Sequence, residues 1–281
     1  MGARPAGRTG EPARKGIPVS VVPTTVSIRN GLFETPVYRK GSGAPLLWLH
    51  AAGGLNKGWT PELEALSQQY DVIAPVHPGW DDTAGLEHID DIHDMVVYYQ
   101  DFLDALGLAS VFVAGHSIGA MFAAELAAAR PDMVKKLVLT CPVGLWMDET
   151  PVTDMFTKLP NELPGVIFGD LSNPIIPQLF TRPTDPDELA DAMYLQLANF
   201  SATGKFIWPI PDKGLKKRLH RVKSPTLILW GEQDNLTPFA YAALFQSKIK
   251  NSRVVSFKGP GHMLPLENTP AWAKEVADFL G

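Results

Sequence analysis

The run Gly-His-Ser-Ile-Gly at residues 115–119 constrains the fold more than any other part of the sequence, because a strand there is expected to turn directly into a helix. Residues 111–114 are β-branched, aromatic or alanine, which is typical of a buried strand. Residues 118–129 are rich in alanine and end before an Arg-Pro pair, which indicates a helix closed ahead of a proline. A serine at such a sharp turn has its hydroxyl lifted above the sheet, and flanking glycines avoid clashes between the strand and the helix. We therefore interpret Ser117 as a nucleophile.

Composition narrows the class of protein. The chain has 281 residues, 45% of them hydrophobic and 20% charged, with a net charge of -5. A negative charge argues against nucleic acid or an anionic membrane as the main partner, and no apolar run reaches the length of a membrane span. The single cysteine, Cys141, excludes an intrachain disulfide and a cysteine metal cluster. We expect a cytoplasmic monomer or homodimer that acts on a small molecule.

The chain is expected to alternate strands with helices. Residues 1–18 form a basic segment that we predict to be a disordered tail, and residues 19–142 and 212–281 are expected to form one α/β core. The predicted strands are residues 19–28, 35–39, 46–50, 71–74, 111–114, 137–141, 226–230 and 253–257. The predicted helices include residues 92–106, a helix near Pro238 with Thr237 as its N-cap, and a helix from Thr269-Pro270 to residue 280. This order predicts a mostly parallel sheet covered on both faces, with an antiparallel hairpin at one edge.

Residues 143–211 break this rhythm. They contain many prolines and large apolar side chains but no clear strand. An insertion of this length within a compact domain is expected to have its own structure. We predict a helical cap over the carboxyl ends of the strands.

Partners for the serine follow the last two predicted strands. Acyl transfer by serine needs a base within hydrogen-bond reach and an acid that fixes the imidazole tautomer. His262 ends a Gly-Pro-Gly-His turn after the last strand and is the predicted base. Asp234, just past the strand at residues 226–230, is the predicted acid, with Glu232 as its nearest rival.

A loop of small residues follows the strand at residues 46–50. A tetrahedral intermediate carries an oxyanion, which fixed backbone N–H groups stabilise. One donor is expected from Ile118, the residue after the nucleophile. The other is expected from Ala52, with Ala51 as the alternative.

Five short motifs together resemble the α/β-hydrolase superfamily: Leu-His-Ala-Ala-Gly at 49–53, His-Pro-Gly-Trp at 77–80, the run at 115–119, Gly-Glu-Gln-Asp at 231–234 and Gly-His at 261–262. The resemblance covers the chain from about residue 20 to its end. It implies a Ser-His-Asp hydrolase with an eight-stranded sheet and a cap after the sixth strand. Where the family usually has a His-Gly loop this chain has His50-Ala51, which leaves the second oxyanion amide open. We expect substrate contacts from His50, Ala51, Gly53, His116 and Trp146.

Several chemistries occur in this superfamily. Dehalogenases and epoxide hydrolases use an aspartate at the elbow, so Ser117 disfavours both. Cofactor-free haloperoxidase-like members share the triad and are not separated by motif. The predicted substrate is a small, mainly apolar ester, and the alternative is carbon–carbon cleavage of a vinylogous diketone, although Met263 stands where such hydrolases often have a tryptophan. A ligand receptor that retains a slow triad is the alternative from another class.

Neither a cofactor nor a metal is expected. The acidic run at residues 81–94 is interpreted as a loop and the negatively charged first turn of the following helix. The basic run at residues 213–221 is interpreted as the solvated face of a helix that joins the cap to the core.

Overall fold

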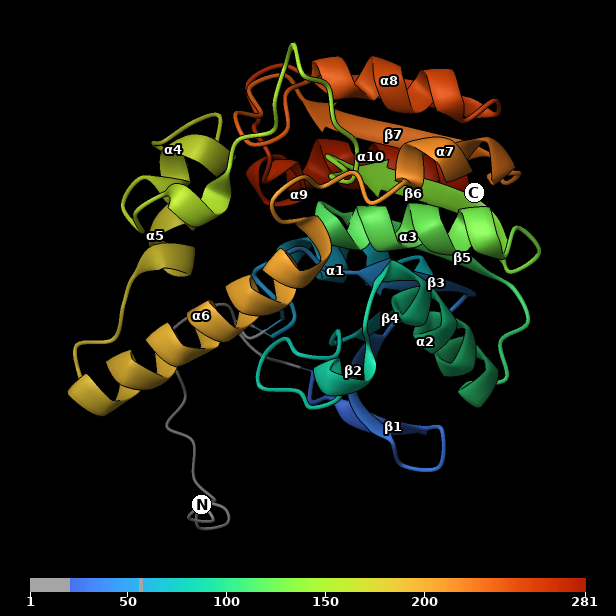
Figure 1. The fold of residues 1–281 in the computed structure, drawn as a ribbon, viewed down its shortest axis with the longest axis horizontal. Helices are drawn as coiled ribbons and strands as arrows, with labels where there is room; N and C mark the ends of the chain where they lie inside the picture. The colour runs from blue at the N-terminus through green and yellow to red at the C-terminus, as the bar shows by residue number, and fades with distance from the viewer. Residues whose placement is uncertain (1–20, 56–57) are drawn as a thin grey trace.

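The sheet determines where every candidate residue lies. The computed structural model describes residues 21–55 and 58–281, so the tail predicted at residues 1–18 lies outside the described part. One eight-stranded sheet has the order β1-β2-β4-β3-β5-β6-β7-β8 (Figure 1). This confirms the predicted fold class. The strands are β1 (Thr24–Ile28), β2 (Phe33–Lys40), β3 (Ala44–Leu49), β4 (Tyr70–Pro75), β5 (Val111–His116), β6 (Val134–Thr140), β7 (Thr226–Gly231) and β8 (Ser252–Phe257).

Strand direction brings the predicted site together at one edge. β1 pairs with β2, and β2 with β4, in antiparallel fashion, whereas all pairs from β4 to β8 are parallel. The carboxyl ends of β3, β5, β6 and β7 therefore meet at the same edge of the sheet. Ligands of open α/β sheets bind at this edge.

Helices cover both faces of the sheet. α2 and α3 pack together on one face, and α1 and α10 pack together on the other (Figure 1). The core contains α1 (Pro61–Ser67), α2 (Ile92–Ala105), α3 (Ile118–Ala129), α8 (Ala240–Lys248), α9 (Leu264–Glu267) and α10 (Thr269–Leu280), with the 3₁₀ turn η1 (Leu86–His88). α3 is buried from Ile118 through Ala128, and its alanines allow this close approach to the sheet. The helix that follows Ser117 is therefore held rigidly.

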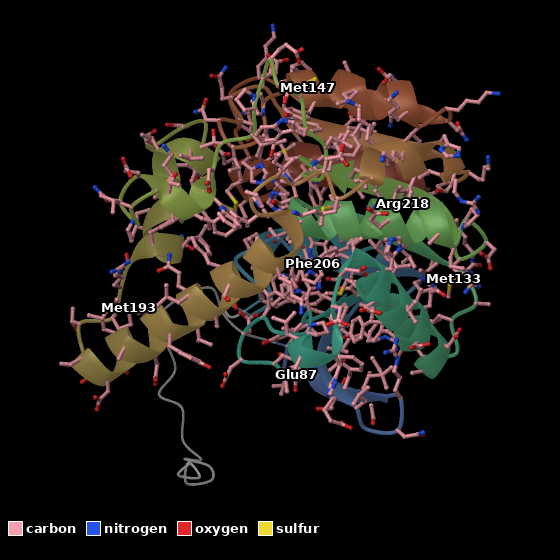
Figure 2. All side chains as sticks on the ribbon, viewed as in Figure 1. Glu87, Met133, Met147, Met193, Phe206 and Arg218 are labelled. Carbon is pink, nitrogen blue, oxygen red and sulfur yellow. The ribbon has the colours of Figure 1, made fainter. Side chains whose placement is uncertain are left out.

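Residues 143–211, which we call the inserted segment, contain no strand in the structure. They form η2 (Met155–Thr157), α4 (Leu163–Ile167), α5 (Ile175–Phe180) and α6 (Pro186–Ile207), and α7 (Leu215–Arg218) and η3 (Leu219–Arg221) return the chain to β7. α4, α5 and α6 lie beyond the edge toward which the β6 and β7 arrows point (Figure 1). The first turns of α6, near Met193, project away from the sheet, whereas Phe206 packs against the core (Figure 2).

Two predicted boundaries were wrong. The strand predicted from residue 19 begins at Thr24 in the described part, because Pro23 lacks the N–H that a ladder hydrogen bond needs. The helix predicted at Pro238 begins at Ala240, and Thr237 does not cap it. The backbone N–H of Thr237 instead donates to the Asp234 carboxylate at 2.8 Å, which holds this stretch in an extended loop.

Candidate active site

Ser117 occupies a strained turn between β5 and α3. Its backbone dihedrals are φ 56° and ψ −118°, a conformation that non-glycine residues rarely adopt. A Cβ on Gly119 would lie 2.1 Å from the Leu49 carbonyl oxygen, and one on Gly115 would lie 2.5 Å from the Gly119 carbonyl oxygen. Both glycines are therefore required for β3, β5 and α3 to approach so closely. The sharp turn raises the serine hydroxyl above the strand ends.

His262 joins Ser117 to Asp234 through two hydrogen bonds. Its Nε2 lies 2.8 Å from Ser117 Oγ, and its Nδ1 lies 2.8 Å from Asp234 Oδ2. All three side chains are buried, with exposed fractions of 5% or less. The structure thus brings together the three residues that the sequence predicted, in a line typical of serine hydrolases.

Asp234 is fixed by its own backbone neighbours. Its Oδ1 accepts the backbone N–H groups of Leu236 and Thr237 at 2.9 and 2.8 Å, which leaves Oδ2 for the imidazole. A carboxylate only accepts, so Nδ1 of His262 carries the proton and Nε2 presents a lone pair to the serine hydroxyl. The rival acid Glu232 instead accepts the hydroxyl of Ser256 at 2.7 Å.

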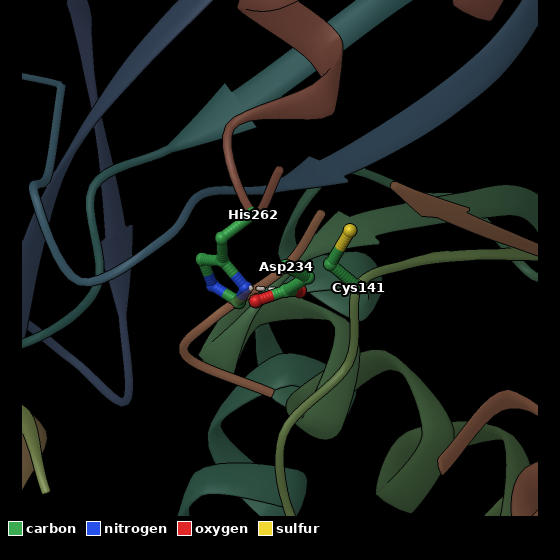
Figure 3. Close-up of side chains that lie close together, drawn as sticks. All are labelled: Cys141, Asp234 and His262. Atoms are coloured by element: carbon green, nitrogen blue, oxygen red, sulfur yellow. Dashed lines mark hydrogen bonds and ion pairs between the residues drawn. The ribbon is translucent and has the colours of Figure 1, made fainter. Parts of the chain in front are cut away.

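Cys141 lies behind the acid, at the end of β6 between β5 and β7 (Figure 3). Its thiol, the Asp234 carboxylate and the His262 imidazole form a buried cluster of metal-ligand types within 4.8 Å. Burial, followed by the negative charge of Asp234, raises the pKa of the Cys141 thiol well above its usual value. The acid and the imidazole are 2.8 Å apart, which fits a hydrogen bond, whereas two ligands about 2 Å from a tetrahedrally coordinated ion such as zinc lie about 3.3 Å apart. The cluster therefore does not fit a metal as it stands.

Ala52, in the loop after β3, lies beside the same cavity as the serine. Ala52, Ile118 and Ser117 line the same cavity. The Ala51 carbonyl accepts the Gly54 N–H at 3.1 Å and lies 2.8 Å from His50 Nδ1. Because N–H and C=O point in opposite directions across a trans peptide, the Ala52 N–H points away from these contacts. It donates to no group among the described residues.

A buried pair of stacked histidines hydrogen-bonds to the backbone of this loop and of its neighbour. The imidazoles of His50 and His77 stack with their centroids 3.5 Å apart. The His77 backbone N–H donates to His50 Nε2 at 3.1 Å, so His50 carries its proton on Nδ1 and donates to Ala51 O. His77 Nε2 donates to the His50 carbonyl at 3.0 Å, which leaves its Nδ1 to accept the Tyr99 hydroxyl. Burial lowers the pKa of His50 to about 4 and that of His77 well below its usual value, so both stay neutral.

His116 supports the base rather than the substrate. Its Nε2 donates to the backbone carbonyl of His262 at 2.7 Å. Burial, with a smaller contribution from His262, lowers the pKa of His116 to about 3. The neutral imidazole of His116 therefore fastens the loop that carries His262 to the end of β5.

The cavity beside Ser117 has a volume of about 220 Å³. Of the predicted substrate contacts, Trp146 lines it, and Ala52, predicted as an oxyanion donor, lines it too. His50, Ala51, Gly53 and His116 are not among the residues that line it, and polar groups of all four take part in contacts that hold the two loops. Their contact with a substrate stays a prediction. Most of the other lining residues were not predicted from the sequence. They are Val143, Val152, Thr153, Asp154, Met155, Phe156, Thr203, Ile207, Trp208, Pro209, Pro211 and Leu236.

A family model described as the alpha/beta hydrolase family matches residues 46–278. The chain belongs to the alpha/beta hydrolase family. This hydrolase is 26% identical to a putative carbamate hydrolase of Pseudomonas savastanoi pv. phaseolicola, over 84% of this chain and 94% of the relative. It is 28% identical to a 2-hydroxy-6-oxononadienedioate/2-hydroxy-6-oxononatrienedioate hydrolase of Pseudomonas putida, over 90% of this chain and 94% of the relative.

Solved structures share the fold of this hydrolase. A meta-cleavage product hydrolase from Pseudomonas fluorescens superposes with a TM-score of 0.73 at 20% identity, over 92% of this chain and 97% of the other. Naproxen esterase from Bacillus subtilis superposes with a TM-score of 0.68 at 21% identity, over 94% and 93% of the two chains. The four proteins compared above are hydrolases, and their named substrates differ widely.

Two charged runs of this hydrolase have structural roles. Asp91, in the acidic run, caps α2 by accepting the backbone N–H of His93 at 2.7 Å. Within the described ranges, Cys141, Asp234 and His262 are the one set of three or more ligand-type side chains that come within 4.8 Å of one another, and the acidic run contributes no such set. In the basic run, Arg218 is not a solvated face residue as predicted, because it forms a bidentate ion pair at 2.6 and 2.7 Å with the buried Glu125 of α3.

No helix in the described part is long and apolar enough to cross a membrane.

Proposed function

We propose that this hydrolase cleaves small, mainly apolar, uncharged esters through an acyl-enzyme on Ser117. The observation that carries the proposal is the Ser117–His262–Asp234 line, buried and with both hydrogen bonds at 2.8 Å, which ends at the cavity. The relatives are hydrolases, which agrees with it.

Each group has a distinct step. His262 Nε2 removes the hydroxyl proton as Ser117 Oγ attacks the acyl carbon, and the same imidazole then protonates the leaving alcohol. The backbone N–H groups of Ile118 and Ala52 stabilise the oxyanion. Asp234 stabilises the imidazolium that forms in between. Water, activated by His262, then releases the acid.

The inserted segment acts as a cap in this proposal. It supplies most of the cavity lining, including Trp146, Phe156 and Trp208. A volume of about 220 Å³ is below the roughly 300–1,000 Å³ of drug-sized ligand sites. We therefore expect a short acyl chain and a small alcohol.

Carbon–carbon cleavage is the second candidate, because relatives bear that activity in their names. The name of the Pseudomonas putida relative describes a dianionic substrate. A buried carboxylate needs a cation or several N–H donors. No lysine, arginine or histidine is among the described residues that line this cavity, and Asp154 adds an acid to it. This lining favours an uncharged ester over a dienoate.

The test is hydrolysis of p-nitrophenyl esters from acetate to long chains, with Ser117→Ala measured beside the wild type. We expect turnover to be highest for short chains and to vanish in the variant. Turnover that persists in Ser117→Ala would refute the serine mechanism. No turnover on any ester, combined with cleavage of a vinylogous diketone, would establish the second candidate instead.

A further inference from the structure

A buried amide from the inserted segment reaches the loop of residues 51–55, which we call the oxyanion loop. Asn199 lies on α6, a mostly exposed helix, yet only 2% of its surface is exposed. The buried residues of α6 are Asn199, Ala202, Thr203 and Phe206, a spacing that defines a single face of its carboxyl-terminal half. Asn199 is therefore a polar group at the point where α6 docks.

Both polar atoms of the Asn199 amide form hydrogen bonds with residues of the core. Nδ2 donates to the Gly53 carbonyl at 3.1 Å and to Asp81 Oδ1 at 2.8 Å. Oδ1 accepts the Asp81 backbone N–H at 2.8 Å. The orientation of the amide follows from these partners, because a carbonyl and a carboxylate only accept and an N–H only donates.

Asp81 extends the connection to the far end of the oxyanion loop. Its Oδ2 accepts the Leu55 backbone N–H at 2.5 Å. Its backbone has φ 52°, in the left-handed region, a conformation that persists where surrounding contacts hold it. Asn199 thus holds the loop directly at Gly53 and indirectly at Leu55.

Three successive carbonyls of the oxyanion loop are fixed by side chains. Ala51 O accepts from His50, Ala52 O accepts from the Trp80 indole at 3.1 Å, and Gly53 O accepts from Asn199. His50 and Trp80 belong to the core, and only the third contact comes from the inserted segment. The Ala52 N–H lies in the plane of the Ala51–Ala52 peptide, and the Gly53 carbonyl that Asn199 holds lies two peptides further along. Asn199 therefore acts on the Ala52 N–H through the backbone of the loop.

We propose that Asn199 is a positioning residue that couples docking of α6 to the geometry of the oxyanion hole. The inference rests on the proposed function, because it needs Ala52 to be an oxyanion donor. With α6 docked, the amide fixes Gly53 and Asp81, and the Ala52 N–H points at the cavity. With α6 displaced, Gly53 O and the Asp81 N–H lose their partner, and the loop is free to relax. Docking of α6 and the geometry of the oxyanion hole therefore change together.

A fluorophosphonate probe tests this without knowledge of the natural substrate, because phosphonylation of a serine develops negative charge on an oxygen at the same donors. The variants are Asn199→Ala and Asn199→Asp; the second keeps the size and the acceptor but replaces the NH₂ group by an oxygen that faces the Asp81 carboxylate and the Gly53 carbonyl, so it cannot donate to both. The matched control is Tyr194→Phe, because the Tyr194 hydroxyl on the same helix donates at 3.1 Å to Asp82, whose carboxylate does not hydrogen-bond to the described residues 51–55. Labelling rates, ester kcat and KM, and urea unfolding are measured for each.

Complete loss of one oxyanion donor costs about 100–1,000-fold in rate, so a displaced donor is expected to cost roughly 10–100-fold. We expect that loss in labelling rate and kcat for both Asn199 variants, with KM changed less than about twofold, and a Tyr194→Phe rate close to the wild type. If Asn199→Ala does not fold, Asn199→Asp decides. Labelling of both folded variants at the wild-type rate, or a raised KM with unchanged kcat, would overturn the role of Asn199 alone. Failure of the wild type to be labelled at Ser117 would refute the nucleophile and the inference with it.

Discussion

Replacing Asp234 by asparagine tests the proposed chemistry through a single atom. Two backbone N–H groups, those of Leu236 and Thr237, point at Oδ1. The asparagine oxygen must therefore take that place, and its NH₂ group must face His262 Nδ1. The amide then donates to Nδ1, so the imidazole proton moves to Nε2 and faces Ser117. The base then holds a proton where it needs a lone pair.

The expected magnitude follows from this wrong tautomer. Removing the base function costs about 1,000–10,000-fold in kcat, which is about 4–5 kcal/mol of transition-state stabilisation at 1.36 kcal/mol per tenfold. Binding contacts in the cavity do not involve Asp234, so KM is expected to change little. The assay is kcat and KM on a short p-nitrophenyl ester, with circular dichroism to show that the fold is kept.

Glu232→Gln is the matched control, because Glu232 belongs to the same turn and bonds Ser256 rather than His262. It is expected to keep activity within about twofold, since it is remote from the transition-state charge. The reasoning would be refuted if Asp234→Asn kept activity within tenfold of the wild type, or if Glu232→Gln lost as much.

Three further predictions concern packing and charge. Gly119→Ala is expected to lower kcat by about 100-fold or more, because the new Cβ would lie 2.1 Å from a β3 carbonyl and shift the elbow. Gly165→Ala, whose Cβ meets nothing within 4 Å, is expected to be silent in the same ester assay. Arg218→Met is expected to reduce the free energy of unfolding in urea by about 3–5 kcal/mol, because it leaves Glu125 buried without its partner; an equal loss in a variant with Glu125→Leu added would contradict this. The free energy of unfolding in urea is also expected to fall as the pH is lowered from about 6.5 to 4. Burial holds the pKa of His50 at about 4, so in this range the unfolded chain takes up a proton that the folded chain does not. A free energy of unfolding that stays constant over this range would contradict the prediction.

The sequence predicted the elements that local patterns define. All eight strands were found within a few residues, and Ser117, Asp234 and His262 come together because each directly follows a parallel strand. The order of strands also implies that Cys141, after β6, lies between the nucleophile and the acid.

The residues that support the site were missed for a physical reason. Asn199 lies on α6, whose sequence mixes polar and apolar residues. Its burial depends on how α6 docks and is not indicated by any local sequence pattern. His50 and His116 were predicted to contact the substrate because they flank the loop and the nucleophile. In the structure both imidazoles are buried and neutral, and each hydrogen-bonds to a backbone carbonyl. Thr237 does not cap α8, because the helix begins three residues later, at Ala240, with Phe239 at its N-cap position.

The central claim is that Ser117 forms a covalent acyl-enzyme. The most direct measurement is rapid-quench mass spectrometry during hydrolysis of p-nitrophenyl acetate, with peptide mapping of the adduct. The account predicts one acetyl group on Ser117, formed as the first equivalent of p-nitrophenol is released and lost as turnover ends. Turnover with no acetyl group on Ser117 at any time, or with the acetyl group on another residue, would contradict it.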